Sequence, residues 1–267
     1  MKSTRPTVAD LLSMKGKRQL TKLRVTTLDQ AAAAQAAGID ILSVTPEVMT
    51  DPQYRDAAPG CFTIPGSVKM FHALRDDVMN EAFRMMRAGA DAVYCAASLD
   101  TIRALRDEGV PVCGHSGLIP AHATWTGGYR AVGKTAESAI FVWRQVKALE
   151  EAGAFAAEIE VVPVDVAAEI SRRTSLFMIS MGAGSGCDAQ YLFAEDVLGE
   201  NRGRYPRHSK VYRNFAAEYD RLQNERIAAF KEFALDVETG RYPAANHVVG
   251  IEPGELAAFR RLLDEQG

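Results

Sequence analysis

The chain has 267 residues, of which 24% are charged and 47% hydrophobic, and its formal net charge is −3. This composition is typical of a globular protein, and the near-neutral charge argues against nucleic acid or an anionic membrane surface as a partner. No segment reaches the roughly 18 apolar residues that a membrane helix requires, so we expect a cytoplasmic protein without a membrane partner. Four scattered cysteines, with no Cys-x-x-Cys pair, predict buried thiols rather than a zinc site or disulfides: Cys61, Cys95, Cys113 and Cys187.

Five segments repeat one order, an amphipathic helix followed by a short apolar strand. Ala, Leu, Met, Glu and Arg favour helix in each first part, and four glycines fit left-handed C-caps: Gly38, Gly89, Gly109 and Gly153. The predicted helices cover 29–38, 77–89, 99–109, 138–153 and 164–175. The predicted strands follow within 39–44, 90–96, 110–115, 154–162 and 176–181.

Short strands that are apolar on both faces are typical of parallel strands buried under helices. Alternating helices and strands therefore predict a parallel α/β sheet. Neither GxGxxG nor GxxxxGK[ST] occurs, which argues against a nucleotide-binding doubly wound sheet. We predict a single (β/α)8 barrel domain over residues 1–267.

Two regions depart from the repeat. Residues 47–71 contain several turn formers and predict a long βα loop near the active face, with one strand at Cys61–Ile64. Residues 224–240 and 255–266 predict helices that, from about residue 215 onward, cap the barrel or join subunits.

In a barrel of this kind the chemistry lies at the carboxyl ends of the strands. His115 and Ser116 follow one predicted strand, and a histidine there could donate to a substrate oxygen or hold a structural hydrogen bond. Glu158 and Glu160 share one face of another strand. Glu160, nearer the end, is the better candidate for a general acid or base, and Glu158 is expected deeper and paired with a cation; a purely structural ion pair is the alternative.

Further candidates for substrate binding lie at the ends of neighbouring strands. The turn Gly182–Gly186 follows a predicted strand, and we expect a helix after it at 187–193. Such a turn could offer backbone N–H groups to a carboxylate or phosphate. The alternative is a tight turn with no ligand. We therefore expect substrate contacts from the following residues: Thr45, Glu47, Tyr94, Ser116, Gly182, Gly184 and Ser185. No cluster of two or three carboxylates that would hold Mg²⁺ is evident.

Several strings between about Thr7 and Val248 resemble the ketopantoate hydroxymethyltransferase (3-methyl-2-oxobutanoate hydroxymethyltransferase) family in order and spacing. The strongest are PVCGHSGLIP (111–120), TGGYRAVGK (126–134), ALEEAGAFAAEIEVVP (148–163), MISMGAGSGCDAQYLFAEDVLG (178–199) and ETGRYPAANH (238–247). The resemblance implies a (β/α)8 barrel of the phosphoenolpyruvate mutase and isocitrate lyase type, a homo-oligomer that is usually a decamer, and a role like that in pantothenate biosynthesis. It also implies a transferase that moves a one-carbon unit from methylenetetrahydrofolate to a 2-oxo acid chelated by Mg²⁺.

Carried over by position, the resemblance makes Glu160 the group that moves the proton next to the carbonyl and His115 its partner. Other positions depart from the family. The metal-binding Asp residues fall at Pro46 and Gly66, and the Lys-x-Glu string falls at Tyr94 and Ala96, so no metal ligands are expected. The side chains that could substitute as electrophile are Arg24, Lys69, His72 and Tyr94.

Three hypotheses follow. The first is an enzyme of the hydroxymethyltransferase type that makes or breaks a C–C bond next to the carbonyl of a small 2-oxo acid. The second is a metal-independent enzyme that acts on another small carbonyl or carboxylate compound. The third is a non-catalytic barrel that keeps only the fold and the oligomer.

Overall fold

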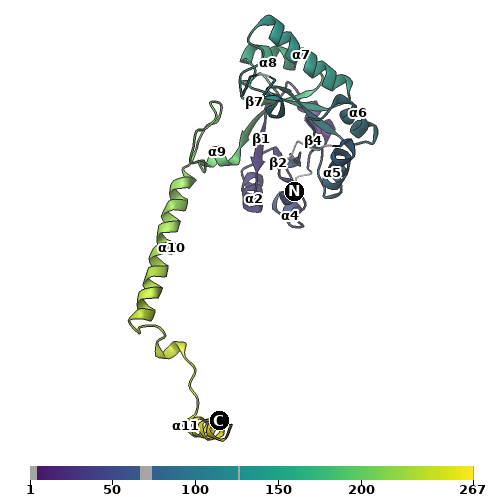
Figure 1. Ribbon diagram of the computed structural model, residues 1–267. Helices are drawn as coiled ribbons and strands as arrows, with labels where there is room; N and C mark the ends of the chain where they lie inside the picture. Colours follow the sequence, from purple (N-terminus) through teal and green to yellow (C-terminus); the bar gives the residue numbers. More distant parts are fainter. Residues whose placement is uncertain (1–4, 67–73, 126, 267) are drawn as a thin grey trace. The chain divides into compact units, whose positions relative to one another are not determined.

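The computed structural model describes residues 5–66, 74–125 and 127–266 (Figure 1). The chain divides into two compact units, Met1–Arg213 and Asn214–Gly267. The strands of the first unit are β1 (Leu20–Val25), β2 (Ile41–Val44), β3 (Phe62–Thr63), β4 (Val93–Tyr94), β5 (Val112–Gly117), β6 (Ala156–Glu160), β7 (Phe177–Met181) and β8 (Ala189–Phe193). Its helices are α1 (Val8–Met14), α2 (Leu28–Ala36), α3 (Pro46–Met49), α4 (Tyr54–Ala57), α5 (Arg75–Arg87), α6 (Leu99–Asp107), η1 (Pro120–His122), α7 (Ala136–Glu151), α8 (Val164–Arg173) and α9 (Ala194–Leu198).

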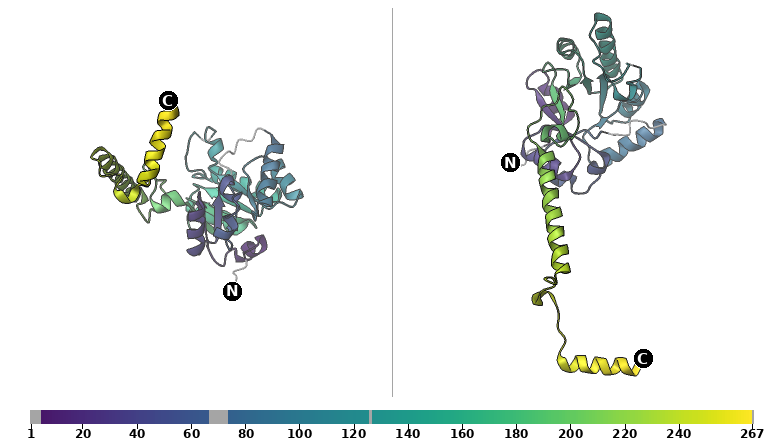
Figure 2. Two further views of the ribbon diagram at one scale, coloured as in Figure 1. Left: turned by 90° about the horizontal axis from the view of Figure 1, so that it is seen from below. Right: turned by 60° about the vertical axis from the view of Figure 1, so that its left-hand side comes forward.

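The eight strands form one parallel sheet in the order β3-β2-β1-β8-β7-β6-β5-β4. Two backbone hydrogen bonds also join the segments of the outer strands β3 and β4. The Asp91 N–H donates to the Thr63 carbonyl at 3.1 Å, and the Tyr94 N–H donates to the Pro65 carbonyl at 3.3 Å. Helices α5, α6, α7 and α8 lie outside this curled sheet (Figures 1 and 2). The predicted α/β fold with a parallel sheet is thereby confirmed, and closure of the sheet into a (β/α)8 barrel stays a prediction.

The repeating units form for the local reasons that the sequence indicates. Helices α2, α6 and α7 begin at hydroxyl N-caps, where the side chains of Thr27, Ser98 and Thr135 accept backbone N–H groups that would otherwise lack partners. The predicted glycine C-caps are left-handed, with φ between 76° and 95°: Gly38, Gly89, Gly109 and Gly153. The predicted strand near residue 62 is confirmed as β3, but the loop around it also contains the short helices α3 and α4.

The connection between β7 and β8 corrects one prediction, because Ala189–Phe193 is a strand rather than a helix. Strand β8 pairs in parallel with both β7 and β1, so its backbone hydrogen bonds go to the sheet. Two glycines of the connecting segment allow it to pass against α8: a Cβ atom on Gly184 would lie 2.3 Å from Val164, and one on Gly186 would lie 2.3 Å from Ala168. These glycines are explained by close packing against the helix.

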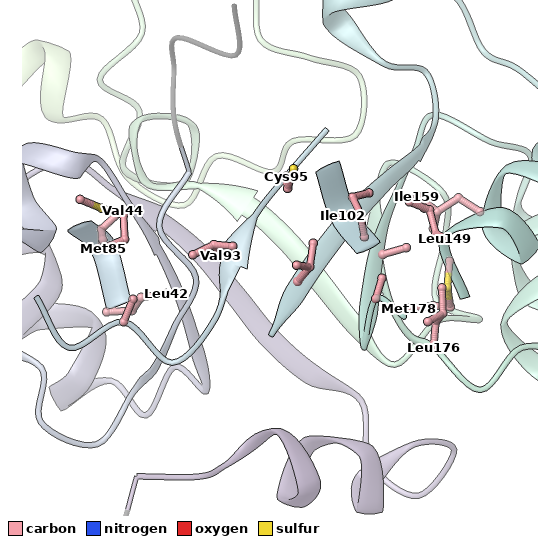
Figure 3. Packing of buried hydrophobic residues seen from close by; sticks show 14 of the residues in the cluster. Leu42, Val44, Met85, Val93, Cys95, Ile102, Leu149, Ile159, Leu176 and Met178 are labelled. Carbon is pink, nitrogen blue, oxygen red and sulfur yellow. The ribbon is translucent and has the colours of Figure 1, made fainter. Parts of the chain in front are cut away.

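The buried apolar side chains form two clusters. The larger one lies between the sheet and the helices, and Figure 3 shows Leu42, Val93, Ile102 and Met178 from it. The smaller one includes inward side chains of the sheet together with Leu11 of α1; its members include Leu20, Ile41, Phe62, Phe155, Phe177 and Ile179. Apolar residues therefore cover both faces of the strands, as expected for a buried parallel sheet.

The unit Asn214–Gly267 contains α10 (Phe215–Glu238), η2 (Ala245–His247) and α11 (Pro253–Gln266). Helix α10 begins nine residues before the predicted start at Asn224 and is one continuous helix (Figure 2). None of the residues described in these two helices is buried. A capping or subunit-joining role for them stays a prediction. No helix in the described part of the chain is long and apolar enough to cross a membrane.

Candidate active site

A cavity of about 410 Å³ opens where β1, β2, β4, β5, β6 and β8 end. This volume lies within the range of roughly 300–1,000 Å³ that is usual for small-molecule sites. Polar side chains gather around it from strands that are far apart in sequence. They are Arg24, Ser43, Tyr94, His115, Glu158, Glu160, Tyr191, Asp196, His208 and Ser209.

The floor of this cavity contains Glu158, whose carboxylate forms a buried ion pair with Lys22. Lys22 lies on β1, directly opposite Tyr191 of β8, and its ammonium group sits 4.3 Å from the centre of the Tyr191 ring. Its Nζ donates to Glu158 Oε1, and both side chains are almost fully buried. Burial opposes ionisation of Glu158, but the charges and hydrogen bonds of Lys22 and His115 together outweigh it and hold the pKa of that carboxyl below its usual range. The prediction that Glu158 pairs with a cation is confirmed.

His115 lies on β5 between two carboxylates. Its Nδ1 is 3.5 Å from Glu158 Oε2, and its Nε2 is 3.2 Å from Glu160 Oε2. Burial alone would lower the pKa of His115, but hydrogen bonds to Glu158 and Glu160 and their charges raise it to about 9. The imidazole is therefore protonated at neutral pH and balances the second carboxylate.

Glu160 ends β6 and is held by the backbone around it. Its carbonyl accepts from the Leu118 N–H at 2.9 Å, and the next N–H, that of Val161, donates to Met181 at 2.9 Å. Val161 has φ of +47°, a left-handed conformation that is rare for a β-branched residue and costs of order 1–3 kcal/mol. Backbone strain of this kind concentrates at functional sites, and here it sits directly beside the carboxylate that we consider the general base.

Arg24 and Tyr94 complete the polar rim. The Arg24 guanidinium lies 5.2 Å from the Phe193 ring centre, and its Nη1 donates to Glu195 at 3.0 Å. The Tyr94 hydroxyl lies 2.8 Å from His115 Nδ1. His208 and Ser209 come from the segment after α9, where the Ser209 hydroxyl donates to Asp196 at 2.7 Å.

The structure thus brings together His115, Glu160 and Tyr94 of the predicted site residues. Ser116 points the other way along the same strand, and its buried hydroxyl donates to the Glu158 carbonyl at 3.1 Å. Thr45 caps α3, where its hydroxyl accepts from the Val48 N–H at 3.4 Å. Glu47, in the first turn of that helix, is exposed. None of Ser116, Thr45 and Glu47 lines the cavity.

The glycine-rich segment also lies apart from this cavity. Gly182 packs against the imidazole of His208, and Gly184 packs against α8. The Ser185 carbonyl accepts from the side chain of Gln19, which precedes β1, at 2.7 Å. The segment therefore runs away from the carboxyl ends of the strands toward the start of β8. Lys69 and His72, which we considered as substitute electrophiles, lie outside the described residues.

The charged residues of the floor do not suit a divalent cation. Pro46 and Gly66 carry no carboxylate, and Glu158 and Glu160 are already paired with cationic groups. Within residues 5–66, 74–125 and 127–266 no three His, Cys, Asp or Glu side chains are grouped so that they could hold a metal, and 67–73 include no acidic residue in sequence. Since Mg²⁺ is bound through carboxylates, this donor set does not fit it.

Lys22 and Tyr191 are the candidate site residues that the sequence analysis missed. Lys22 and Arg24 alternate with apolar residues in the string LTKLRV, so both face the same side as Leu20. A cation on the inward face of a buried strand is costly without a counter-charge. That alternation was the signal that could have identified the partner of Glu158.

The architecture defines a class, an α/β protein with a curled, parallel eight-stranded sheet. The structure of 2,3-dimethylmalate lyase, a member of the PEP mutase/isocitrate lyase superfamily, matches 98% of this chain and 100% of its own with a TM-score of 0.50 and 14% sequence identity, which shows the fold alone.

Sequence comparison gives the family. The family model for ketopantoate hydroxymethyltransferase matches residues 67–245. The 3-methyl-2-oxobutanoate hydroxymethyltransferase of Kosmotoga olearia is 32% identical over 264 residues, 90% of this chain and 96% of that protein. The same-named protein of Nitratidesulfovibrio vulgaris is 36% identical over 73% of this chain, and this match spans only 62% of its length. The chain belongs to the ketopantoate hydroxymethyltransferase family.

Proposed function

We propose that this chain catalyses hydroxymethyl transfer or a related aldol-type reaction at the carbon next to the carbonyl of a small 2-oxo acid. The observation that carries the proposal is the contact of 3.2 Å between Glu160 and His115 at the cavity. A carboxylate beside a protonated imidazole, above a buried ion pair, is an arrangement that can accept and return a proton. Family membership supports the reaction type.

In the proposed reaction, Glu160 removes the proton from the carbon next to the carbonyl. The C–H electron pair forms a C=C bond, and the carbonyl oxygen becomes an enolate oxygen. The enolate carbon then forms a C–C bond to the one-carbon unit, whose two C–N bonds to the folate break while water supplies the hydroxyl oxygen of the product. Methylenetetrahydrofolate, named by the resemblance, is the proposed donor. Arg24 lines the cavity and supplies a guanidinium for the carboxylate of the 2-oxo acid.

The first half of this reaction can be measured without the one-carbon donor. In D₂O, exchange of the C3 proton of 3-methyl-2-oxobutanoate is followed by NMR. We expect exchange by the wild type and a loss of about 10²–10⁴-fold in Glu160→Gln, the range for a general base. Glu151→Gln, which changes an exposed carboxylate at the end of α7 outside the cavity lining, is the matched control. No exchange by the folded wild type would refute the proposal and support a non-catalytic barrel.

A second candidate function is a metal-independent reaction on a related small carboxylate. The observation that favours it is that both floor carboxylates are paired with Lys22 and His115. The test repeats the exchange assay after treatment with a chelator and after addition of Mg²⁺, and compares 3-methyl-2-oxobutanoate with other 2-oxo acids. Equal rates in the two conditions support the second candidate. A rate that disappears with the chelator and returns with Mg²⁺ contradicts it.

We also propose a homo-oligomer, in which the resemblance implies a decamer. The described part of the unit Asn214–Gly267 supports it, since Phe230 is 70% exposed and Phe233 is 56% exposed. Large apolar side chains that are exposed together are typical of interaction surfaces. Light scattering coupled to size-exclusion chromatography measures the assembly, and a monomer at all concentrations would contradict it.

A further inference from the structure

The hydroxyl group of Tyr94 contacts His115, and the Tyr94 side chain lines the cavity. Tyr94 ends β4, and its ring meets the imidazole of His115 edge-on, with centroids 5.8 Å apart at 86°. The hydroxyl oxygen is 2.8 Å from His115 Nδ1. The side chain also lines the cavity. It is therefore placed between a fixed partner behind it and the space for substrate in front.

The surroundings of His115 determine which way this hydrogen bond runs. Nε2 faces the Leu118 carbonyl at 2.8 Å and Glu160 Oε2 at 3.2 Å; both are acceptors, so Nε2 carries a hydrogen. Nδ1 faces Glu158 Oε2 at 3.5 Å in addition to Tyr94. With a carboxylate near each nitrogen and a pKa raised to about 9, the ring carries both hydrogens at neutral pH.

A doubly protonated ring can only donate, so Tyr94 must accept from Nδ1–H. Its own hydrogen is then directed elsewhere. Among the residues that the structure describes, the only hydrogen bond of the Tyr94 hydroxyl is the one to His115. Burial, followed by the charge of Glu158, raises the pKa of Tyr94, so the hydroxyl keeps its hydrogen. The cavity is the remaining place for an acceptor.

We propose that Tyr94 is a catalytic residue, whose O–H donates to the carbonyl oxygen of the bound 2-oxo acid and stabilises the enolate oxygen formed when Glu160 takes the neighbouring proton. This inference rests on the proposed function. The C–H bond breaks, its electron pair becomes the C=C bond, the carbonyl π pair moves to oxygen, and the proton stays on Glu160. Tyr94 keeps its own proton throughout.

This role supplies a donor that the paired charges of the floor lack. Lys22 and His115 are engaged with Glu158 and Glu160, while Tyr94 directs a hydrogen toward the developing negative charge. A pre-oriented donor in a site shielded from water contributes about 10²–10³-fold to the rate when it acts on such an oxyanion. Because His115 holds the Tyr94 oxygen from behind, the donor needs no rearrangement as charge develops.

The test uses Tyr94→Phe in the full chain, with the C3 exchange assay in D₂O. We expect kcat for exchange to fall about 10²–10³-fold, as for loss of an oxyanion donor. KM for 3-methyl-2-oxobutanoate should change by less than about threefold, because the interaction strengthens only as charge forms. Tyr54→Phe is the control: it removes a buried tyrosine hydroxyl that is bonded to Thr63 at 2.8 Å outside the cavity lining.

A binding measurement separates this inference from the proposed function. Oxalate is a planar dianion that resembles the enolate, and calorimetry gives its affinity for each variant. We expect Tyr94→Phe to weaken oxalate binding about tenfold or more, the effect of a lost hydrogen bond to a charged group. If the wild type shows no exchange, the proposed function fails and the oxalate comparison alone decides the role of Tyr94. Equal exchange by Tyr94→Phe and wild type, or equal or undetectable oxalate binding by both, overturns the role.

Discussion

The two ends of the space inside the curled sheet differ in chemistry although the same strands build both. Toward the start of the strands the interior is apolar, with Leu20, Phe62 and Phe177 in one buried cluster. Two residues further along β1 the interior becomes charged, at Lys22. Every second residue of a strand faces inward, so one inward position can be apolar and the next one charged. The interior therefore changes from an apolar core to a charged site while the strand pairing stays the same. We therefore expect substitutions at the apolar end to affect stability alone and substitutions at the charged end to affect both stability and chemistry.

The largest effect is expected for Lys22→Met at the charged end. The substitution leaves Glu158 buried without its cation, and removing one partner of a buried pair costs about 3–5 kcal/mol. Urea unfolding measures this loss, and C3 exchange should fall with it. The double variant Lys22→Met/Glu158→Gln should recover part of the stability, because no uncompensated charge remains. A loss below about 1 kcal/mol in the single variant, the size of an exposed pair, would contradict the pairing.

At the apolar end, Phe177→Ala should cost about 3–5 kcal/mol in the free energy of unfolding, since Phe177 is fully buried and truncation leaves a cavity. The exchange rate per folded molecule should not change. Activity is measured at a temperature where the circular dichroism spectrum shows the variant folded. A large loss of exchange in the folded variant would show that the two ends are coupled.

Stability should also depend on pH through His115, which is faced by Glu158, Glu160, Tyr94 and, across Glu158, Lys22. Its pKa is about 9 in the folded chain against 6.5 as the ordinary value, so its contribution is complete below pH 6.5 and disappears as pH rises through 9. The change is on the order of 3 kcal/mol. Unfolding in urea from pH 6 to 9.5 measures it, and His115→Gln should remove most of the slope. Equal slopes in the two proteins would contradict the raised pKa.

The smallest effect is expected for Ser116→Ala. Ser116 neighbours His115 in sequence but points out of the cavity and donates to the Glu158 carbonyl. Its loss should cost about 1 kcal/mol of stability, the net value of one hydrogen bond. The exchange rate should stay within about twofold of the wild type, as expected for a change that removes no transition-state contact. A tenfold loss of exchange would instead support the substrate-binding role that its sequence position first indicated.

Local pattern was sufficient for most of the fold. The positions of α2, α5, α6 and α7 follow from their helix-favouring residues and terminal glycines, and the strands after them follow from short apolar runs. The helix–strand pattern gave the wrong element at Ala189–Phe193. Only seven residues, with no helix among them, connect β7 to this strand, so it departs from the repeat. The strand is fixed by pairing with β1, a contact that no local window contains.

Local pattern also predicted individual residues of the site, but not the contacts between distant strands. The shared face of Glu158 and Glu160 follows from the period of a strand, and the nearby histidine follows from its place at a strand end. The pairing of Glu158 with Lys22 joins residues 136 positions apart. The direction of the Tyr94 hydroxyl depends on carboxylates from another strand.

By itself, the sequence determined the alternation of helix and strand, the parallel sheet and the family, because helix propensity, glycine caps and apolar runs act over a few residues. Only the tertiary structure decided which charges meet. The curvature of the sheet brings the ends of β1, β4, β5 and β6 around one cavity, and burial there makes every unpaired charge costly. Lys22, Glu158, His115 and Glu160 are therefore set as alternating charges by three-dimensional proximity, which no spacing along the chain expresses.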